Sequence, residues 1–75
     1  SNKDKPVDKK IINLFNDILL LDENYLLGLW VIADNEILGN NYNKAEQLLN
    51  RILIQLSEGT EEYNLVLRKL NELQN

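Results

Sequence analysis

The residues whose types could do chemistry are few in this 75-residue chain, and their spacing does not suit catalysis. The sequence contains no histidine and no cysteine, so it offers no imidazole base, no thiolate nucleophile and no thiolate metal site. Glu61 and Glu62 are adjacent, so on a helix their carboxylates would point about 100° apart and could not act on one substrate atom. Ser57 and Thr60 have no partner base and are interpreted as turn and capping residues. We therefore expect a protein that is not an enzyme and needs no cofactor or metal.

The composition predicts one small globular domain with an acidic body. Hydrophobic residues make up 44% of the chain, which is too apolar for a disordered segment. The net charge is −4, and it is uneven: four lysines and two aspartates give +2 in the first ten residues, which leaves −6 for the rest. An acidic body repels phosphate backbones, so no nucleic-acid partner is expected.

The beginning of the chain suggests an excised domain. The Ser1-Asn2 start resembles the remnant of a cleaved expression tag, so residues 1–5 are interpreted as a tag remnant and frayed start, and 6–75 as a single helical domain from a larger protein. No apolar run approaches the roughly 18 residues of a membrane span, and no signal peptide is visible.

Four stretches carry the apolar spacing of amphipathic helices, which predicts an all-α fold. The predicted helices cover residues 6–21, 24–38, 42–56 and 60–73. Pro6 falls in a first helical turn, where its missing N–H is tolerated. Connections of two to four residues predict that consecutive helices are antiparallel neighbours.

Residues with special backbone preferences mark the helix ends. The cluster Asp22-Glu23-Asn24 supplies cap candidates before the second helix, and Gly39 with Asn40 tolerates the left-handed conformation at its end. Asn41 is the candidate N-cap of the third helix. Gly59 is the expected terminator of the next connection, and Thr60 is the expected N-cap of the fourth helix.

The spacing also predicts which residues face inward. In the first helix these are Val7, Ile11, Phe15, Ile18 and Leu19; in the third, Ala45, Leu48, Leu49, Ile52, Leu53 and Leu56; in the fourth, Tyr63, Val66, Leu67, Leu70 and Leu73. The second helix carries two stripes, one of Leu26, Leu29, Ala33 and Ile37, the other of Leu27, Trp30, Val31, Asp34 and Leu38. A helix that is apolar on two sides is either buried between neighbours or presents a surface to a partner.

A 34-residue register relates these helices to one another. The tetratricopeptide pattern W-x2-L-G-x2-Y, A-x3-F and P aligns with Leu29, Ile32, Ala33, Glu36, Ala45, Leu49 and Ser57. Small residues occupy both small positions, whereas Leu29, Glu36 and Ser57 depart from the pattern. The chain thus resembles half a repeat, one full repeat and a closing helix of a right-handed tetratricopeptide-like superhelix. A generic four-helix bundle is the alternative.

Two longer stretches narrow the resemblance. Leu29-Trp30, the Asn41-Tyr42 turn and the connection 58–62 (EGTEE) resemble the last repeat and tail of the periplasmic tetratricopeptide proteins of c-type cytochrome maturation, which accompany the haem lyase. The similarity spans about residues 11–73, and it departs where Leu48 or Leu49 replaces a common tryptophan. It implies a periplasmic module that holds apocytochrome c, particularly its C-terminal segment, for haem attachment, in a parent protein that could be anchored in the inner membrane.

The same resemblance implies that the client binds on the concave side formed by the first helices of repeats. The candidate protein-binding residues are Leu27, Trp30, Asp34, Ile37, Leu38 and Arg68. Core packing is the alternative for Trp30, and a solvated or paired surface role is the alternative for Asp34 and Arg68. Two other functions remain open: an assembly role, in which the second stripe of the second helix packs on another subunit or domain, and an unrelated tetratricopeptide adaptor.

Overall fold

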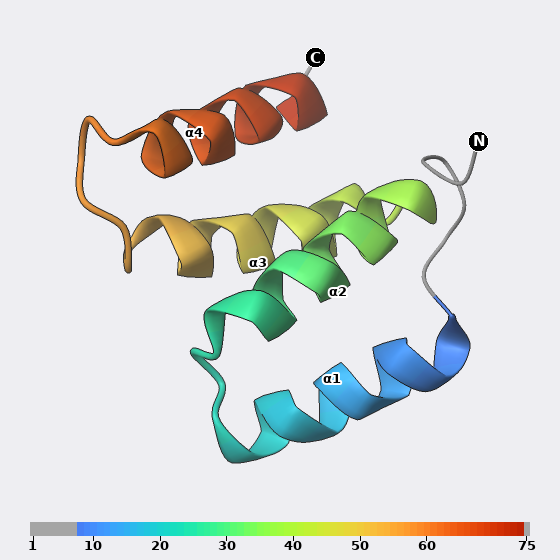
Figure 1. Ribbon diagram of the computed structural model, residues 1–75. Helices are drawn as coiled ribbons and strands as arrows, with labels where there is room; N and C mark the ends of the chain where they lie inside the picture. Colours follow the sequence, from blue (N-terminus) through green and yellow to red (C-terminus); the bar gives the residue numbers. More distant parts are fainter. Residues whose placement is uncertain (1–7, 75) are drawn as a thin grey trace.

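The structure, a computed structural model, describes residues 8–74 and is helical apart from short connections over that range. Its helices are α1 (Lys9–Leu21), α2 (Leu26–Leu38), α3 (Tyr42–Leu53) and α4 (Glu61–Gln74). Each helix packs on the next one and runs in the opposite direction, so that α2 and α3 form the middle of a linear array (Figure 1). The all-α fold of helical hairpins that the apolar spacing predicts is therefore confirmed.

The start of α1 is set by an aspartate cap. Asp8 is not helical, and its Oδ1 atom accepts a hydrogen bond from the backbone N–H of Lys10 at 2.8 Å. The predicted start at residue 6 was therefore too early. Pro6 and the proposed tag remnant at 1–5 lie outside the described residues.

The start of α2 also differs from the prediction, by two residues. The Oδ1 atom of Asp22 accepts a hydrogen bond from the backbone N–H of Asn24 at 3.2 Å, which holds the connection in a turn. The N-cap is Tyr25, which makes no side-chain capping bond. The helix ends at Leu38 as predicted, and Asn40 takes the left-handed conformation, with φ of 61°.

The connection from α3 to α4 begins earlier than predicted. Helix α3 ends at Leu53 because the chain tightens after it: the N–H groups of Gln55 and Leu56 donate to carbonyls three residues before them, at 3.0 and 3.1 Å. The predicted end at residue 56 was three residues too late. Leu56 nevertheless packs against the core, as its place in the stripe predicts.

The start of α4 confirms the predicted cap. Gly59 has φ of 88°, the left-handed conformation in which a side chain is strained. The Oγ1 atom of Thr60 accepts a hydrogen bond from the backbone N–H of Tyr63 at 3.3 Å. Two glutamates follow in the first turn, where negative charge is stabilised by the helix dipole.

The core lies among α2, α3 and α4. Its buried residues are Leu29, Ile32, Ala33, Leu48, Leu49, Ile52, Val66 and Leu70. Ala33 and Ala45 are both fully buried, on the two helices that pack most extensively on each other, as their small size predicts. Leu67, a predicted inward residue of α4, is instead 37% exposed and is not among the side chains packed against the core.

The inward face of α1 differs from the prediction. Phe15 and Leu19 pack against the core as expected, and Ile12 does so as well. Ile11, which was predicted to face inward, is 44% exposed. Ile18 is half-buried but does not belong to the core or to the side chains packed against it.

A close approach between α1 and α2 explains why α1 turns a different face towards the core than predicted. A Cβ atom at Gly28 would lie 3.2 Å from side-chain atoms of Leu19 and Tyr25, so the glycine allows α1 to come near. The rings of Phe15 and Tyr25 stack with their centroids 6.4 Å apart. Seating Phe15 and Leu19 against this part of α2 turns Ile11 and Ile18 towards the outside.

Candidate functional site

The outer side of α2 carries most of the predicted protein-binding residues. Leu27 and Leu38 are each about half exposed, at 52% and 51%, and Val31 is half-buried, whereas the half-buried Ile37 packs against the core cluster. The opposite side of the same helix is filled by Leu29, Ile32 and Ala33, which are buried. Because the inner side of α2 is already packed in the core, the exposed apolar residues on its outer side are available for contact with another chain.

Trp30 takes part in both sides of α2. Its side chain is half-buried and packs against the core cluster, so part of the indole stabilises the fold. The remainder is accessible one helical turn from Leu27, on the same side of the helix. The sequence left open whether Trp30 lies in a binding groove or in the core. In the structure Trp30 packs partly against the core and also borders the outer side of α2.

A hollow of about 260 Å³ lies between α2 and α4. It is lined by Asp34, Ile37 and Leu38 from α2 and by Lys69 from α4. Lys69 Nζ donates a hydrogen bond to Asp34 Oδ1 at 3.4 Å, and both side chains are partly exposed. Three of the six predicted site residues are therefore brought together, and Asp34 is paired with a cation.

Lys69 is the site residue that the sequence analysis missed. The prediction assigned the cation of α4 to Arg68, whereas Lys69 reaches α2. The available signal was helical spacing: Lys69 is four residues before Leu73, which packs against the core, and four after Leu65. Residues 65, 69 and 73 therefore share one side of α4, and of these Lys69 lines the hollow.

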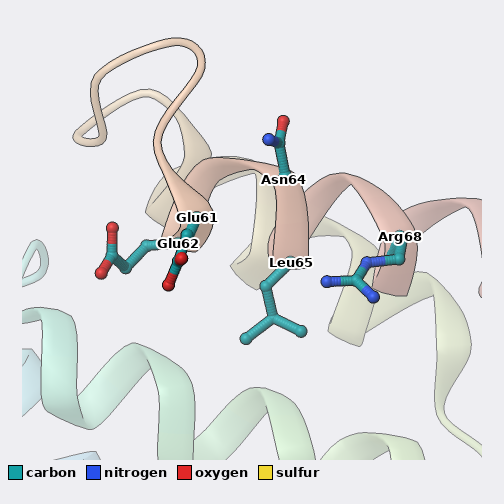
Figure 2. Close-up of a pocket in the computed structure, with 5 residues that line it drawn as sticks. All are labelled: Glu61, Glu62, Asn64, Leu65 and Arg68. Carbon is teal, nitrogen blue, oxygen red and sulfur yellow. The ribbon is translucent and has the colours of Figure 1, made fainter.

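Arg68 belongs to a second hollow, of about 440 Å³, on α4 itself. The residues that line it are Glu61, Glu62, Asn64, Leu65 and Arg68. Figure 2 shows Leu65 between the two carboxylates at one end and the Arg68 guanidinium at the other, with Asn64 pointing to the opposite side. An apolar side chain flanked by acidic and basic groups can hold a peptide that has a complementary order of charges.

A third hollow, of about 580 Å³, surrounds the turn between α2 and α3. Its lining is polar apart from the ring of Tyr42 and consists of Glu36, Asn40, Asn41, Tyr42, Asn43 and Lys44. The Tyr42 hydroxyl donates to Asn40 Oδ1 at 2.8 Å, and Lys44 Nζ lies 3.8 Å from Glu36 Oε1. These contacts hold the turn and leave little apolar surface for an anchor.

The arrangement suits binding by surface contact. Within residues 8–74 no group of three or more histidine, cysteine, aspartate or glutamate side chains is placed to hold a metal ion. Over the same residues no helix combines the length and apolar character needed to cross a membrane. What the described surface offers is an apolar stripe on α2 with the Asp34–Lys69 pair near Leu38, and a separate hollow on α4 lined by both signs of charge.

Searches of family models, of curated proteins and of solved structures each find nothing that matches this chain.

Proposed function

We propose that this chain is a protein-binding module that receives a segment of another protein on the surface formed by α2 and α4. The observation that carries the proposal is the outer stripe of α2. Leu27 and Leu38 are about half exposed along a helix whose inner side is already buried in the core. Partly exposed apolar side chains around an aromatic residue are typical of the centre of a binding surface.

Polar groups at one end of this stripe and on α4 give the proposed surface a direction. The Asp34–Lys69 pair lies at the end of the stripe near Leu38, and Arg68 lies with two glutamates further along α4. Exposed ion pairs of this kind contribute little to stability, so they can exchange partners with a client at small cost. We propose that Arg68 binds a client carboxylate while the α2 stripe receives apolar side chains.

We propose apocytochrome c, through its C-terminal segment, as the client. Support comes from the resemblance of Leu29-Trp30, Asn41-Tyr42 and residues 58–62 to the periplasmic tetratricopeptide proteins of c-type cytochrome maturation. On this proposal the chain works without catalysis, in the periplasm, together with haem lyase subunits. The chain contains neither histidine nor cysteine, which is consistent with a carrier role that leaves haem attachment to the partner enzyme.

An assembly role is the second candidate, because the same observation supports it. If another subunit or domain covers Leu27, Trp30 and Leu38 permanently, the α2 stripe is part of an obligate interface rather than a client site. The two candidates differ in affinity and exchange: a client must leave, whereas an assembly partner stays bound.

Titration with synthetic apocytochrome C-terminal peptides tests the client proposal. Trp30 is the only tryptophan, so its fluorescence reports on the proposed surface directly. We expect saturable binding in the micromolar range, with a loss of roughly three- to tenfold in affinity for Leu38→Ala. A peptide with an amidated C-terminus should bind more weakly, because it lacks the carboxylate that Arg68 is proposed to bind. The affinity of the Arg68→Ala variant should be the same for the amidated and the free peptide.

Leu20→Ala is the matched control. Leu20 is 85% exposed on α1, so its truncation removes an exposed leucine of the same kind away from the α2 stripe and should leave peptide affinity unchanged. Absence of any fluorescence or calorimetric signal at high micromolar peptide would rule out the client and leave the assembly role. Equal losses in both leucine variants would place binding elsewhere.

A further inference from the structure

Helix α1 carries an apolar stripe that no described helix covers. The stripe consists of residues spaced by three, four and three positions: Ile11, Leu14, Ile18 and Leu21. Leu14 is 56% exposed and Leu21 is 93% exposed, and none of the four belongs to the core or to the side chains packed against it. Unlike α2, α3 and α4, this helix has no fully buried residue.

The other end of the array is built differently. The outer side of α4 is mostly polar and presents exposed residues such as Glu61, Asn64, Arg68 and Asn71. End helices of stacked arrays are polar outside when only water covers them. The outer side of α4 is polar in this way, whereas the stripe on α1 is apolar, which indicates that α1 forms an interface.

The charges beside the stripe indicate its partner. Lys10 and Asp17 are seven residues apart, almost two helical turns, so they flank the stripe on one side. Two copies of α1 in antiparallel orientation would place Lys10 of each copy near Asp17 of the other. A parallel pair would put this edge of the two copies on opposite sides of the seam and lose these contacts, and the helix dipoles also favour the antiparallel arrangement.

We propose that this face pairs two copies of the chain through antiparallel α1 helices, about a twofold axis near Leu14. Ile11 of one copy then packs close to Ile18 of the other. A helix of 13 residues is roughly 20 Å long, so the interface is small and the dimer weak, with a Kd on the order of 100 µM. The face is separate from the α2–α4 surface, so self-association and client binding can be tested independently.

Sedimentation equilibrium of the 75-residue chain, from about 10 µM to about 1 mM, tests the proposal. We expect a monomer–dimer equilibrium. Leu14→Gln should weaken it at least about tenfold, because each dimer buries two copies of this leucine. Leu20→Gln changes an exposed leucine on another side of α1 and should leave the equilibrium unchanged. A monomer throughout the range, or association that Leu14→Gln leaves intact, would overturn the proposal.

A charge exchange tests the antiparallel arrangement. Lys10→Glu and Asp17→Lys should each weaken the dimer roughly threefold or more, and the double variant should return to within about twofold of the original. Lys10→Glu adds negative charge near the N-terminus of α1, where it stabilises the helix, so weaker association cannot be ascribed to unfolding. Circular dichroism confirms that each variant remains helical. A double variant as weak as the single ones would contradict the arrangement.

Discussion

Ala45 shows how much of this fold depends on one side chain being small. It is fully buried on α3, the helix that packs most extensively on α2. Ala45→Leu adds three carbon atoms where the packing has no room, and we expect the free energy of unfolding to fall by about 1–3 kcal/mol. Urea denaturation measures this change. Gln47→Leu introduces the same side chain at an exposed position of α3, and an equal loss there would contradict the packing argument.

Trp30 is the second residue at which the structure decides between packing and binding. Because its side chain is half-buried and packs against the core, Trp30→Ala should cost about 2–3 kcal/mol, less than a fully buried tryptophan. Client affinity should fall as well, since the exposed part of the ring borders Leu27. Trp30→Phe should restore most of the stability. If truncation leaves the unfolding midpoint unchanged, the core contribution of Trp30 is disproved.

At the scale of elements, the connection between α3 and α4 depends on the backbone at Gly59. Its φ of 88° is strained for any side chain, and no atom lies within 4 Å of an added Cβ, so the cost of substitution is a backbone cost alone. Gly59→Ala should reduce stability by about 1 kcal/mol. Gly39→Ala, at a φ of −86°, is the control and should change the thermal midpoint less.

The interiors of the helices were predictable from sequence, whereas their ends, and the face that α1 turns towards the core, were less predictable. Apolar spacing gives the register of α3 because its inner face is continuous. Helix α2 starts later than predicted because the Asp22 side chain accepts a hydrogen bond from the Asn24 N–H and keeps the chain in a turn. The rotation of α1 depends on the contact with Tyr25 and Gly28, which spacing within α1 cannot reveal. Local chemistry therefore decided the boundaries, and a contact between helices decided the face.

The same distinction applies to the candidate site. Leu27 and Leu38 were predictable because a helix with two apolar stripes must leave one of them outside the core, whereas Ile37 belongs to the inner stripe and packs against the core. Helical spacing could place Lys69 on the same side of α4 as Leu73, but its pairing with Asp34 depends on how α4 lies relative to α2. Arg68, one residue earlier, points into a different hollow. Residues supplied by a single helix follow from its pattern, whereas a pair across two helices requires their packing.

At the scale of the whole molecule, residues 8–74 form a linear array in which close helix packing joins neighbours along the chain, while the Lys69 side chain also reaches from α4 to Asp34 of α2. Stability in such an array is close to a sum of local terms, so its ends open before its centre. Helices α2 and α3 hold most of the buried residues, while α1 holds none. Local stability should therefore be highest in α2 and α3 and lowest in α1.

Native-state hydrogen exchange measures this gradient and also links it to self-association. In dilute protein the amides of α1 should exchange fastest among the helices, and those of α2 and α3 slowest. Raising the protein to about ten times the dimer Kd should slow exchange in α1 selectively, since pairing stabilises that helix by mass action. Leu14→Gln should abolish the concentration effect without altering α3. If α1 is as protected as α3 in dilute solution, contacts beyond α2 already cover its stripe, and the array does not end at an open helix.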